Sequence, residues 1–199
     1  MSALRSAPST RLLLATRNPG KLVELQRMLT AFDVVGLADV PQFPEAPETG
    51  ATFAENALAK ARDAAAATGL PSVADDSGLA VDALNGMPGV LSARWSGRHG
   101  DDRANLELLL AQVGDVPDER RGAAFVCAAA LVVPGGPETV VHGSWTGRLT
   151  RAPRGTNGFG YDPIFVPEGE TRTTAEMSPA EKDAISHRGK AFRRLAQLL

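Results

Sequence analysis

The order of the expected secondary-structure elements predicts an α/β protein with a mixed sheet flanked by helices. Helices and strands alternate through the first half of the chain, and two long apolar runs, 123–133 and 139–150, follow in the second half. The Pro-Gly-Gly-Pro turn at 134–137 joins these runs, so we expect an antiparallel hairpin. Alternating strands and helices favour parallel pairing, and the hairpin adds an antiparallel pair, so the sheet is expected to be mixed.

Hydrophobic spacing predicts each element of the first half. The apolar run 11–16 is typical of a buried strand, and Leu22, Leu25 and Leu29 share one face of a helix expected over 21–32. The elements expected next are a strand at 34–37, a proline-rich loop at 41–47, an alanine-rich helix at 52–68, a strand at 72–81 and a helix at 101–113.

The C-terminal residues 178–199 are expected to be helical. Ser178-Pro179-Ala180-Glu181 is a capping box with proline at the first helical position, and it predicts where the helix begins. We expect an interruption near Gly189.

Length and composition fit one globular domain over 11–199, preceded by a loose, disordered tail at 1–10. The chain has 199 residues and 20.8 kDa, with 43% hydrophobic and 22% charged residues. The single cysteine, Cys127, excludes an intramolecular disulfide and a cysteine-rich zinc cluster, and its apolar neighbours indicate a core residue.

Charge and hydropathy exclude two classes of partner. A net charge of −2 and a pI of about 5.9 argue against a protein that binds a nucleic acid polymer through its phosphates. No run reaches the length of about 18 apolar residues that a membrane span needs. No apolar signal segment precedes Leu12 either, so we expect a cytoplasmic protein with no membrane partner.

The segment from Thr16 to Lys21 predicts an anion-binding helix end. Asn18 is a favoured N-cap and Pro19 a favoured first helical residue, so the backbone N–H groups that follow point out of the helix end. Lys21 opposes the helix dipole, which suggests a functional reason for its presence. The alternative is a capped helix with a solvated lysine.

Two aspartates interrupt an apolar strand. Asp75 and Asp76 stand where their neighbours predict burial, and a buried carboxylate needs a partner or a metal ion. Neighbouring strand residues face opposite sides, unless a bend at 77–78 presents both carboxylates together. The alternative is a pair of loop aspartates that cap a turn. Glu48 could add a second carboxylate to a magnesium–polyphosphate site, and Lys60 could reach a phosphate.

The glycine-rich loop 154–163 could present a ring to a flat ligand. Glycines flank Phe159, whose ring could stack on a nucleobase, and Asp162 could accept a hydrogen bond. The alternative is a tight turn with the ring in the core. Further along the chain, Lys182, His187 and Arg188 add hydrogen-bond donors.

Five motifs, taken in order, resemble the inosine triphosphate pyrophosphatases, also called Ham1-like or RdgB-like enzymes. They are ATRNPGK, ETGATFAENALAKA, ADDSGLAVDALNGMPGVLSARWSG, GFGYDPIF and AEMSPAEKDAISHRGKA, spread from Leu12 to about Leu198. The resemblance implies a long central mixed sheet, two lobes with an active-site cleft between them, and a homodimer. It also implies Mg²⁺-dependent hydrolysis of ITP, dITP and XTP to the monophosphate and pyrophosphate, which removes deaminated purines from the nucleotide pool.

The resemblance assigns a role to individual residues. Asp76 would be catalytic and contact magnesium, and Glu48 would support the metal. The residues implied to bind the nucleotide are Thr16, Arg17, Asn18, Pro19, Gly20, Lys21, Lys60, Ser77, Phe159, Gly160, Tyr161, Asp162, Lys182, His187 and Arg188. We expect Asp76 to accept a proton from the attacking water, and Arg188 to donate to the purine 6-oxo group that adenine lacks.

Two other functions stay open at this point. The first is a pyrophosphatase of the same broad fold, such as a Maf-like enzyme that acts on modified pyrimidines. The second is a regulator that binds ITP-like nucleotides without cleaving them. A panel of substrates distinguishes the first, and metal-dependent product release distinguishes the second.

Overall fold

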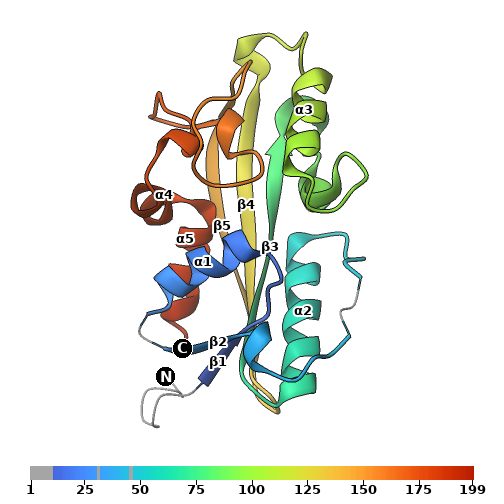
Figure 1. Cartoon of the computed structure of the whole chain (residues 1–199), viewed down its shortest axis with the longest axis vertical. Helices are drawn as coiled ribbons and strands as arrows, with labels where there is room; N and C mark the ends of the chain where they lie inside the picture. Colours follow the sequence, from blue (N-terminus) through green and yellow to red (C-terminus); the bar gives the residue numbers. More distant parts are fainter. Residues whose placement is uncertain (1–10, 31, 45–46) are drawn as a thin grey trace. The chain divides into compact units, whose positions relative to one another are not determined.

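The computed structural model describes residues 11–30, 32–44 and 47–199 (Figure 1). The tail predicted at 1–10 lies outside the described residues. The helices are α1 (Pro19–Met28), α2 (Phe53–Thr68), α3 (Asp102–Gln112), α4 (Pro179–Ile185) and α5 (His187–Ala196). The strands are β1 (Arg11–Leu14), β2 (Asp33–Gly36), β3 (Ser72–Val81), β4 (Gly122–Val132), β5 (Glu138–Leu149) and β6 (Phe165–Pro167).

The strands form a mixed sheet, as the sequence predicts. Across the described residues the order is β2-β1-β3-β4-β5-β6. β1 pairs in parallel with β2 and with β3, whereas β5 and β6 are antiparallel. β4 and β5 are neighbours joined by the short turn 133–137, and such a short connection permits only antiparallel strands. The predicted hairpin is therefore confirmed.

The chain divides into two compact units. The first unit holds the described residues up to Asp76, together with Cys127–Gly143 and Arg188–Leu199. The second unit holds Ser77–Val126 and Ser144–His187. The chain crosses between the units within β3, within β4 and within β5, and again at the start of α5. The single bilobed domain expected over 11–199 stays a prediction.

The core of the first unit lies on both faces of its part of the sheet. Leu12 and Leu14 of β1 pack in one cluster with apolar residues of α1 and α5, whereas Leu13 packs with the alanines of α2. This division follows from the strand geometry, because successive side chains point to opposite faces. Helices consequently cover both faces of this part of the sheet (Figure 1).

The core of the second unit is built around aromatic side chains. The Phe165 ring makes edge-to-face contacts with Phe125 at 4.7 Å and with Trp145 at 5.8 Å between ring centroids. Arg121 is fully buried beside this core, and its guanidinium donates to the carbonyl oxygens of Leu149 and Thr150. The guanidinium also donates to the carbonyl oxygen of Val113, and these bonds give the buried charge polar partners in an apolar setting.

Two predicted features of the helices are displaced by several residues in the structure, the end of α1 and the C-terminal interruption. α1 ends at Met28, before the predicted limit at residue 32, and Leu29 caps it. The C-terminal interruption falls at Ser186, which is extended with φ −66° and ψ 161°, and Gly189 lies inside α5. Among the described residues, no helix has the length and apolar character needed to cross a membrane.

Candidate active site

The N-terminus of α1 is capped as the sequence predicts. The Asn18 side chain accepts a hydrogen bond from the backbone N–H of Lys21 at 3.1 Å, and Pro19 opens the helix. Thr16 Oγ1 lies 3.3 Å from the backbone nitrogen of Asn18 and accepts its N–H. Arg17 is exposed and donates to the carbonyl oxygen of Phe43. The helix end therefore presents the geometry that suits an anion.

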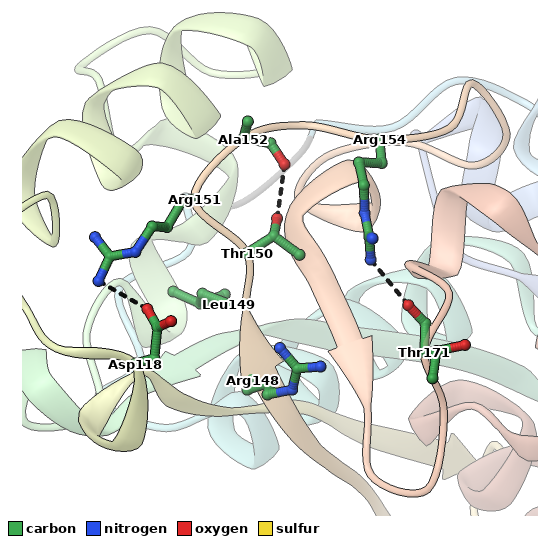
Figure 2. Close-up of a pocket in the computed structure, with 8 residues that line it drawn as sticks. All are labelled: Asp118, Arg148, Leu149, Thr150, Arg151, Ala152, Arg154 and Thr171. Atoms are coloured by element: carbon green, nitrogen blue, oxygen red, sulfur yellow. Dashed lines mark hydrogen bonds and ion pairs between the residues drawn. The ribbon is translucent and has the colours of Figure 1, made fainter.

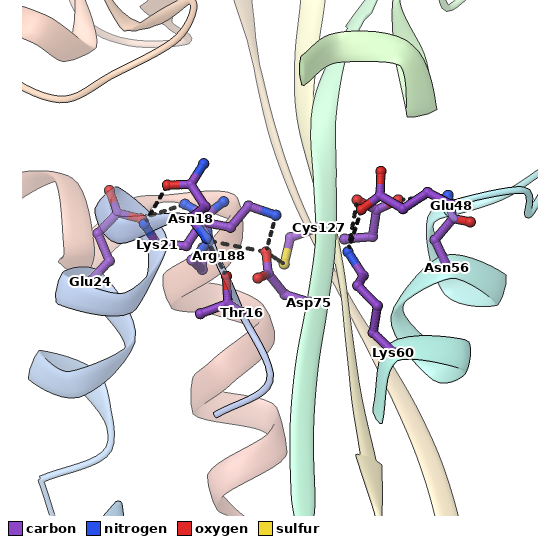
Figure 3. A network of polar contacts seen from close by, with 11 residues as sticks. Thr16, Asn18, Lys21, Glu24, Glu48, Asn56, Lys60, Asp75, Cys127 and Arg188 are labelled. Atoms are coloured by element: carbon purple, nitrogen blue, oxygen red, sulfur yellow. Dashed lines mark hydrogen bonds and ion pairs between the residues drawn. The ribbon is translucent and has the colours of Figure 1, made fainter. Parts of the chain in front are cut away.

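Lys21 is directed toward β3 and is not a solvated lysine. Its Nζ lies 3.1 Å from Asp75 Oδ2, and its side chain is only 12% exposed (Figure 3). An ammonium group opposes the dipole at a helix N-terminus, so the pairing with Asp75 offsets a local cost. The solvated-lysine alternative is wrong.

Asp75 and Asp76 face opposite sides of β3. The strand continues through both residues to Val81, so the bend considered at 77–78 does not form. Asp75 contacts residues of α1 and α5, and Asp76 contacts residues of α2. The alternation of side chains along a strand accounts for this division.

Asp75 is the centre of a buried charge network. Besides Lys21, its Oδ2 accepts from Nε of Arg188 at 3.3 Å, and the Cys127 sulfur lies 3.9 Å away. The other end of the Arg188 guanidinium forms a close ion pair with Glu24. Burial by itself raises the pKa of Asp75, but the positive charges of Lys21 and Arg188 outweigh it and hold the pKa well below its ordinary value.

Glu24 is a member of this network that the sequence did not reveal. It lies in α1 with only 5% of its surface exposed. Nothing in the residues around Glu24 distinguishes it from an ordinary solvated helical glutamate, and its partner Arg188 is far along the chain.

Cys127 is buried, as predicted for a core residue, and burial raises the pKa of its thiol.

Asp76 lies among residues of α2 and of the loop before that helix. Asn56 Nδ2 donates to its Oδ2 at 3.0 Å, and Lys60 Nζ lies 3.5 Å from its Oδ1. The same ammonium lies 2.8 Å from Glu48 Oε1 (Figure 3). Lys60 therefore bridges the carboxylates of Glu48 and Asp76. The one-turn spacing of Asn56 and Lys60 places both on the face of α2 that meets β3.

Gly50 allows the loop that bears Glu48 to pack against α2. Its backbone N–H donates to Asn56 Oδ1 at 2.8 Å. A Cβ atom at this position would lie 2.6 Å from that oxygen and 2.8 Å from the Glu55 Cβ, which is too close for any residue but glycine. Asn56 therefore connects the Glu48 loop to Asp76.

Burial and neighbouring charges act in opposite directions on this cluster. Burial raises the pKa of Asp76, and the charges of Lys60 and Lys21 reduce that rise. Burial lowers the pKa of Lys60, but Asp76, Asp75 and Glu48 outweigh it and raise the pKa overall. Both lysines therefore act electrostatically on Asp76, although Lys21 contacts Asp75 and Lys60 contacts Asp76 on opposite sides of β3.

The Glu48–Asp76 pair fits the ligands that magnesium takes from proteins. Magnesium binds one or two carboxylates and completes its octahedral shell with water and substrate phosphate oxygens. Glu48 and Asp76 approach one cation, Lys60, from different segments of the chain. Outside the gaps at 1–10, 31 and 45–46, no group of three or more His, Cys, Asp or Glu side chains is arranged to hold a metal ion.

In the second unit, Asp162 organises the predicted nucleobase residues. Its Oδ2 accepts from Lys182 Nζ at 2.6 Å and from the backbone N–H of Phe159 at 2.9 Å. Lys182 Nζ lies 5.0 Å from the centroid of the Phe159 ring, within the range of a cation–π contact. Gly158 has a φ of +76°, and a Cβ there would lie 2.0 Å from Asp162 Oδ2, so this turn requires glycine.

The other residues predicted for this part of the site have mixed environments. The Tyr161 hydroxyl donates to the carbonyl oxygen of Ser92 at 2.9 Å, and the His187 ring stacks on Phe125 at 4.8 Å, so both side chains belong to the buried interior. The backbone N–H of Gly160 donates to Asp102 Oδ2. Ser77, also in this unit, is partly exposed on β3.

A cavity of about 530 Å³ in the second unit contains none of the predicted site residues (Figure 2). Arg151 forms an ion pair with Asp118 at 2.7 Å, and Arg154 donates to the carbonyl oxygen of Thr171 at 2.9 Å. The remaining lining residues are Arg148, Leu149, Thr150 and Ala152. Two of its three arginines thus already form contacts within the protein.

Comparisons with known proteins agree on one family. The model of the Ham1 family matches residues 12–198. A protein of Nocardia farcinica named dITP/XTP pyrophosphatase is 68% identical over 194 residues, which cover 95% of this chain and 94% of that protein. A Streptomyces coelicolor protein of the same name is 62% identical over 194 residues, covering 96% and 97% of the two chains.

Solved structures show the same α/β architecture. A nucleoside-triphosphatase, or dITP/XTP pyrophosphatase, from Mycobacterium abscessus has 65% identity and a TM-score of 0.77, covering 95% of this chain and 98% of its own. A HAM1 protein from Coxiella burnetii has 43% identity and a TM-score of 0.84, covering 94% and 97%. Sequence and fold lead to one conclusion: the chain belongs to the Ham1 family.

Proposed function

We propose that this protein hydrolyses the non-canonical purine nucleoside triphosphates dITP, XTP and ITP to the monophosphate and pyrophosphate, and so removes deaminated purines from the nucleotide pool. The observation that carries the proposal is the cluster in the first unit, where Lys60 bridges Glu48 and Asp76 and Lys21 pairs with Asp75. Relatives that are 62–68% identical and named dITP/XTP pyrophosphatases support it.

The phosphate tail would bind at the end of α1. The backbone N–H groups at this helix end favour an anion, and Gly20 allows close approach to the backbone. The ammonium groups of Lys21 and Lys60 would offset the negative charge of the triphosphate. Thr16, Arg17, Asn18 and Pro19 shape this helix end and complete the phosphate site.

Glu48 and Asp76 would hold the magnesium ion. Bound there, the metal would supply stabilisation of the negative charge that develops on the phosphate oxygens. Lys60 already bridges both carboxylates, but its single positive charge offsets only one of their two negative charges, so the pair still favours a cation.

Asp76 would act as the general base. Its carboxylate would accept a proton from the water that attacks the phosphate, with Asn56 Nδ2 holding its orientation through Oδ2. Burial raises the pKa of Asp76, and a carboxylate with a raised pKa is a stronger base.

The second unit would recognise the base. Phe159 would stack on the purine, and Lys182, Asp162 and Gly160 would form the surrounding wall, with the buried Tyr161 contributing through its backbone. His187 and Ser77 of the second unit would also contact the nucleotide, and Arg188, which belongs to the first unit, would donate to the 6-oxo group. The guanidinium contacts Asp75 through Nε and Glu24 through Nη1, so this role draws on a side chain that is also part of the charge network.

We expect a homodimer in the cytoplasm, as the family resemblance implies. Light scattering coupled to gel filtration measures the molar mass directly. A single species of 20.8 kDa would contradict the dimer.

A substrate panel tests the activity. ITP, dITP, XTP, ATP, dUTP, TTP and m5UTP are incubated with Mg²⁺ or with a chelator, and pyrophosphate release is measured. We expect rapid release from dITP, XTP and ITP only, and none with the chelator. Preferential cleavage of the pyrimidine nucleotides would favour a Maf-like enzyme, and binding without release would favour a regulator.

A further inference from the structure

Thr174 is a buried residue of the second unit that contacts Asp162. It opens the short 3-10 helix Thr174–Glu176 and is 0% exposed. Its Oγ1 lies 2.8 Å from Asp162 Oδ1 and 3.0 Å from the Asp162 carbonyl oxygen. One hydroxyl therefore contacts both the side chain and the backbone of Asp162, which restricts how the carboxylate can rotate.

The opposite side of the same carboxylate contacts the residues proposed to recognise the base. Asp162 Oδ2 accepts from Lys182 Nζ and from the backbone N–H of Phe159. The two carboxylate oxygens move as one rigid group, so a rotation that displaces Oδ1 also displaces the acceptor for Lys182. Lys182 Nζ in turn lies 5.0 Å from the Phe159 ring centroid.

We propose that Thr174 is a positioning residue for recognition of the purine. Its hydroxyl sets the orientation of the Asp162 carboxylate, and through Asp162 it holds the Lys182 ammonium and the Phe159 loop in place. This inference rests on the proposed function. It adds a residue that affects base recognition through Asp162, without contacting the base itself.

Two substitutions at Thr174 separate its hydroxyl from its shape. Thr174→Val keeps the branched side chain and removes the hydroxyl, whereas Thr174→Ser keeps the hydroxyl. We expect Thr174→Val to raise KM for dITP and XTP about five- to tenfold, with kcat within about twofold of wild type, because a lost bond to a charged group weakens binding of the base. Thr174→Ser should restore KM to near the wild-type value.

Thr173→Val is the matched control. Thr173 is also 0% exposed, and its Oγ1 donates at 2.8 Å to the carbonyl oxygen of Arg154 instead of to Asp162. We expect its KM to stay within about twofold of wild type. A similar rise in KM for Thr173→Val, or an unchanged KM for Thr174→Val, would overturn the role of Thr174.

Thermal melts show whether Thr174→Val is destabilised. KM can still be measured in a partly unfolded sample, because it does not depend on the amount of folded enzyme. The wild-type protein is measured in parallel. Wild-type protein that releases no pyrophosphate from dITP or XTP would contradict the proposed function itself. Activity in wild type with unchanged KM in Thr174→Val would overturn only the positioning role.

Discussion

The carboxylates of Asp76 in the first unit and Asp162 in the second are both buried beside a lysine, but their surroundings differ. Lys60 lies 3.5 Å from Asp76 and is shared with Glu48, and the Asn56 amide donates to Asp76 at 3.0 Å. Asp162 accepts from Lys182 at 2.6 Å and also from the Phe159 backbone and the Thr174 hydroxyl.

This difference suggests two uses of a buried acid. A carboxylate with a distant, shared ammonium can exchange that partner for another cation or accept a proton. A carboxylate with short bonds from three segments of the chain holds those segments together. We therefore expect substitutions near Asp76 to act mainly on kcat, and substitutions near Asp162 to act mainly on KM.

The largest expected effect comes from Asp76→Asn. The amide keeps the size of the side chain and one acceptor oxygen but removes the general base, so we expect kcat to fall about a thousandfold. Circular dichroism should show an unchanged fold. Asp115→Asn, at an exposed position, is the control and should behave as wild type. Turnover by Asp76→Asn near the wild-type rate would show that Asp76 is not the general base, and that it does not differ from Asp162 in this way.

A second substitution, Lys21→Met, tests the charge network on the opposite side of β3. The change removes one of the two cations that contact Asp75, and breaking a buried ion pair costs about 3 kcal/mol of unfolding free energy. We also expect kcat/KM to fall about a hundredfold because the phosphate loses an ammonium group.

Urea denaturation and steady-state kinetics measure the two effects of Lys21→Met separately. Arg103→Met is a suitable control, since the Arg103 side chain is 89% exposed and pairs with Glu107, which is also exposed. A Lys21→Met protein with wild-type stability and activity would show that the ion pair with Asp75 contributes neither to folding nor to phosphate binding.

A smaller effect is expected from Phe159→Leu. The substitution keeps an apolar side chain but removes the stacking surface, and base–aromatic stacking contributes about 1–3 kcal/mol. KM for dITP should therefore rise about tenfold while kcat changes little. A fall in kcat with an unchanged KM would contradict the assignment of Phe159 to the base. It would also contradict the expectation that substitutions near Asp162 act mainly on KM.

The smallest effect concerns Glu181, at the start of the helix that bears Lys182. Hydrogen bonds from the Ser178 backbone N–H and hydroxyl, and from Arg172, hold the pKa of Glu181 at about 2, below its ordinary value of 4.5. A lowered pKa in the folded state means that Glu181 stabilises the protein above pH 4.5, and that this contribution is lost as the pH falls toward 2.

Glu181→Gln should therefore lower the urea midpoint slightly at pH 7. The difference from wild type should shrink between pH 4.5 and pH 2, where wild-type Glu181 becomes protonated. Urea midpoints measured across this range check the prediction. A difference that stays constant with pH would show that the charge of Glu181 contributes nothing.

Local sequence patterns predicted the parts of the fold that depend on neighbouring residues. Ser72–Val81 is a strand as predicted, and the caps at Asn18 and Ser178 form as their side chains and the following prolines indicate. The predicted break near Gly189 was misplaced, because Ser186 ends α4 through its own backbone conformation and glycine is tolerated inside α5.

The candidate site was predictable only to the extent that its residues break local rules. Lys21 in a first helical turn and Asp75 and Asp76 in an apolar strand each contradict their surroundings, and all three lie in the buried cluster. Glu24 and Thr174 contradict nothing locally, since a helical glutamate and a threonine near a turn are ordinary. Their roles depend on partners at Arg188 and Asp162, far away along the chain.

By itself, the sequence determined the α/β class, the helix caps, the strand that bears the two aspartates and the family resemblance. Only the tertiary structure decided that Asp75 pairs with Lys21 and Arg188 while Asp76 meets Asn56 and Lys60. The physical reason is that caps and strands follow from interactions between neighbouring residues. The partners of a buried charge, in contrast, depend on which helix packs on each face of the strand.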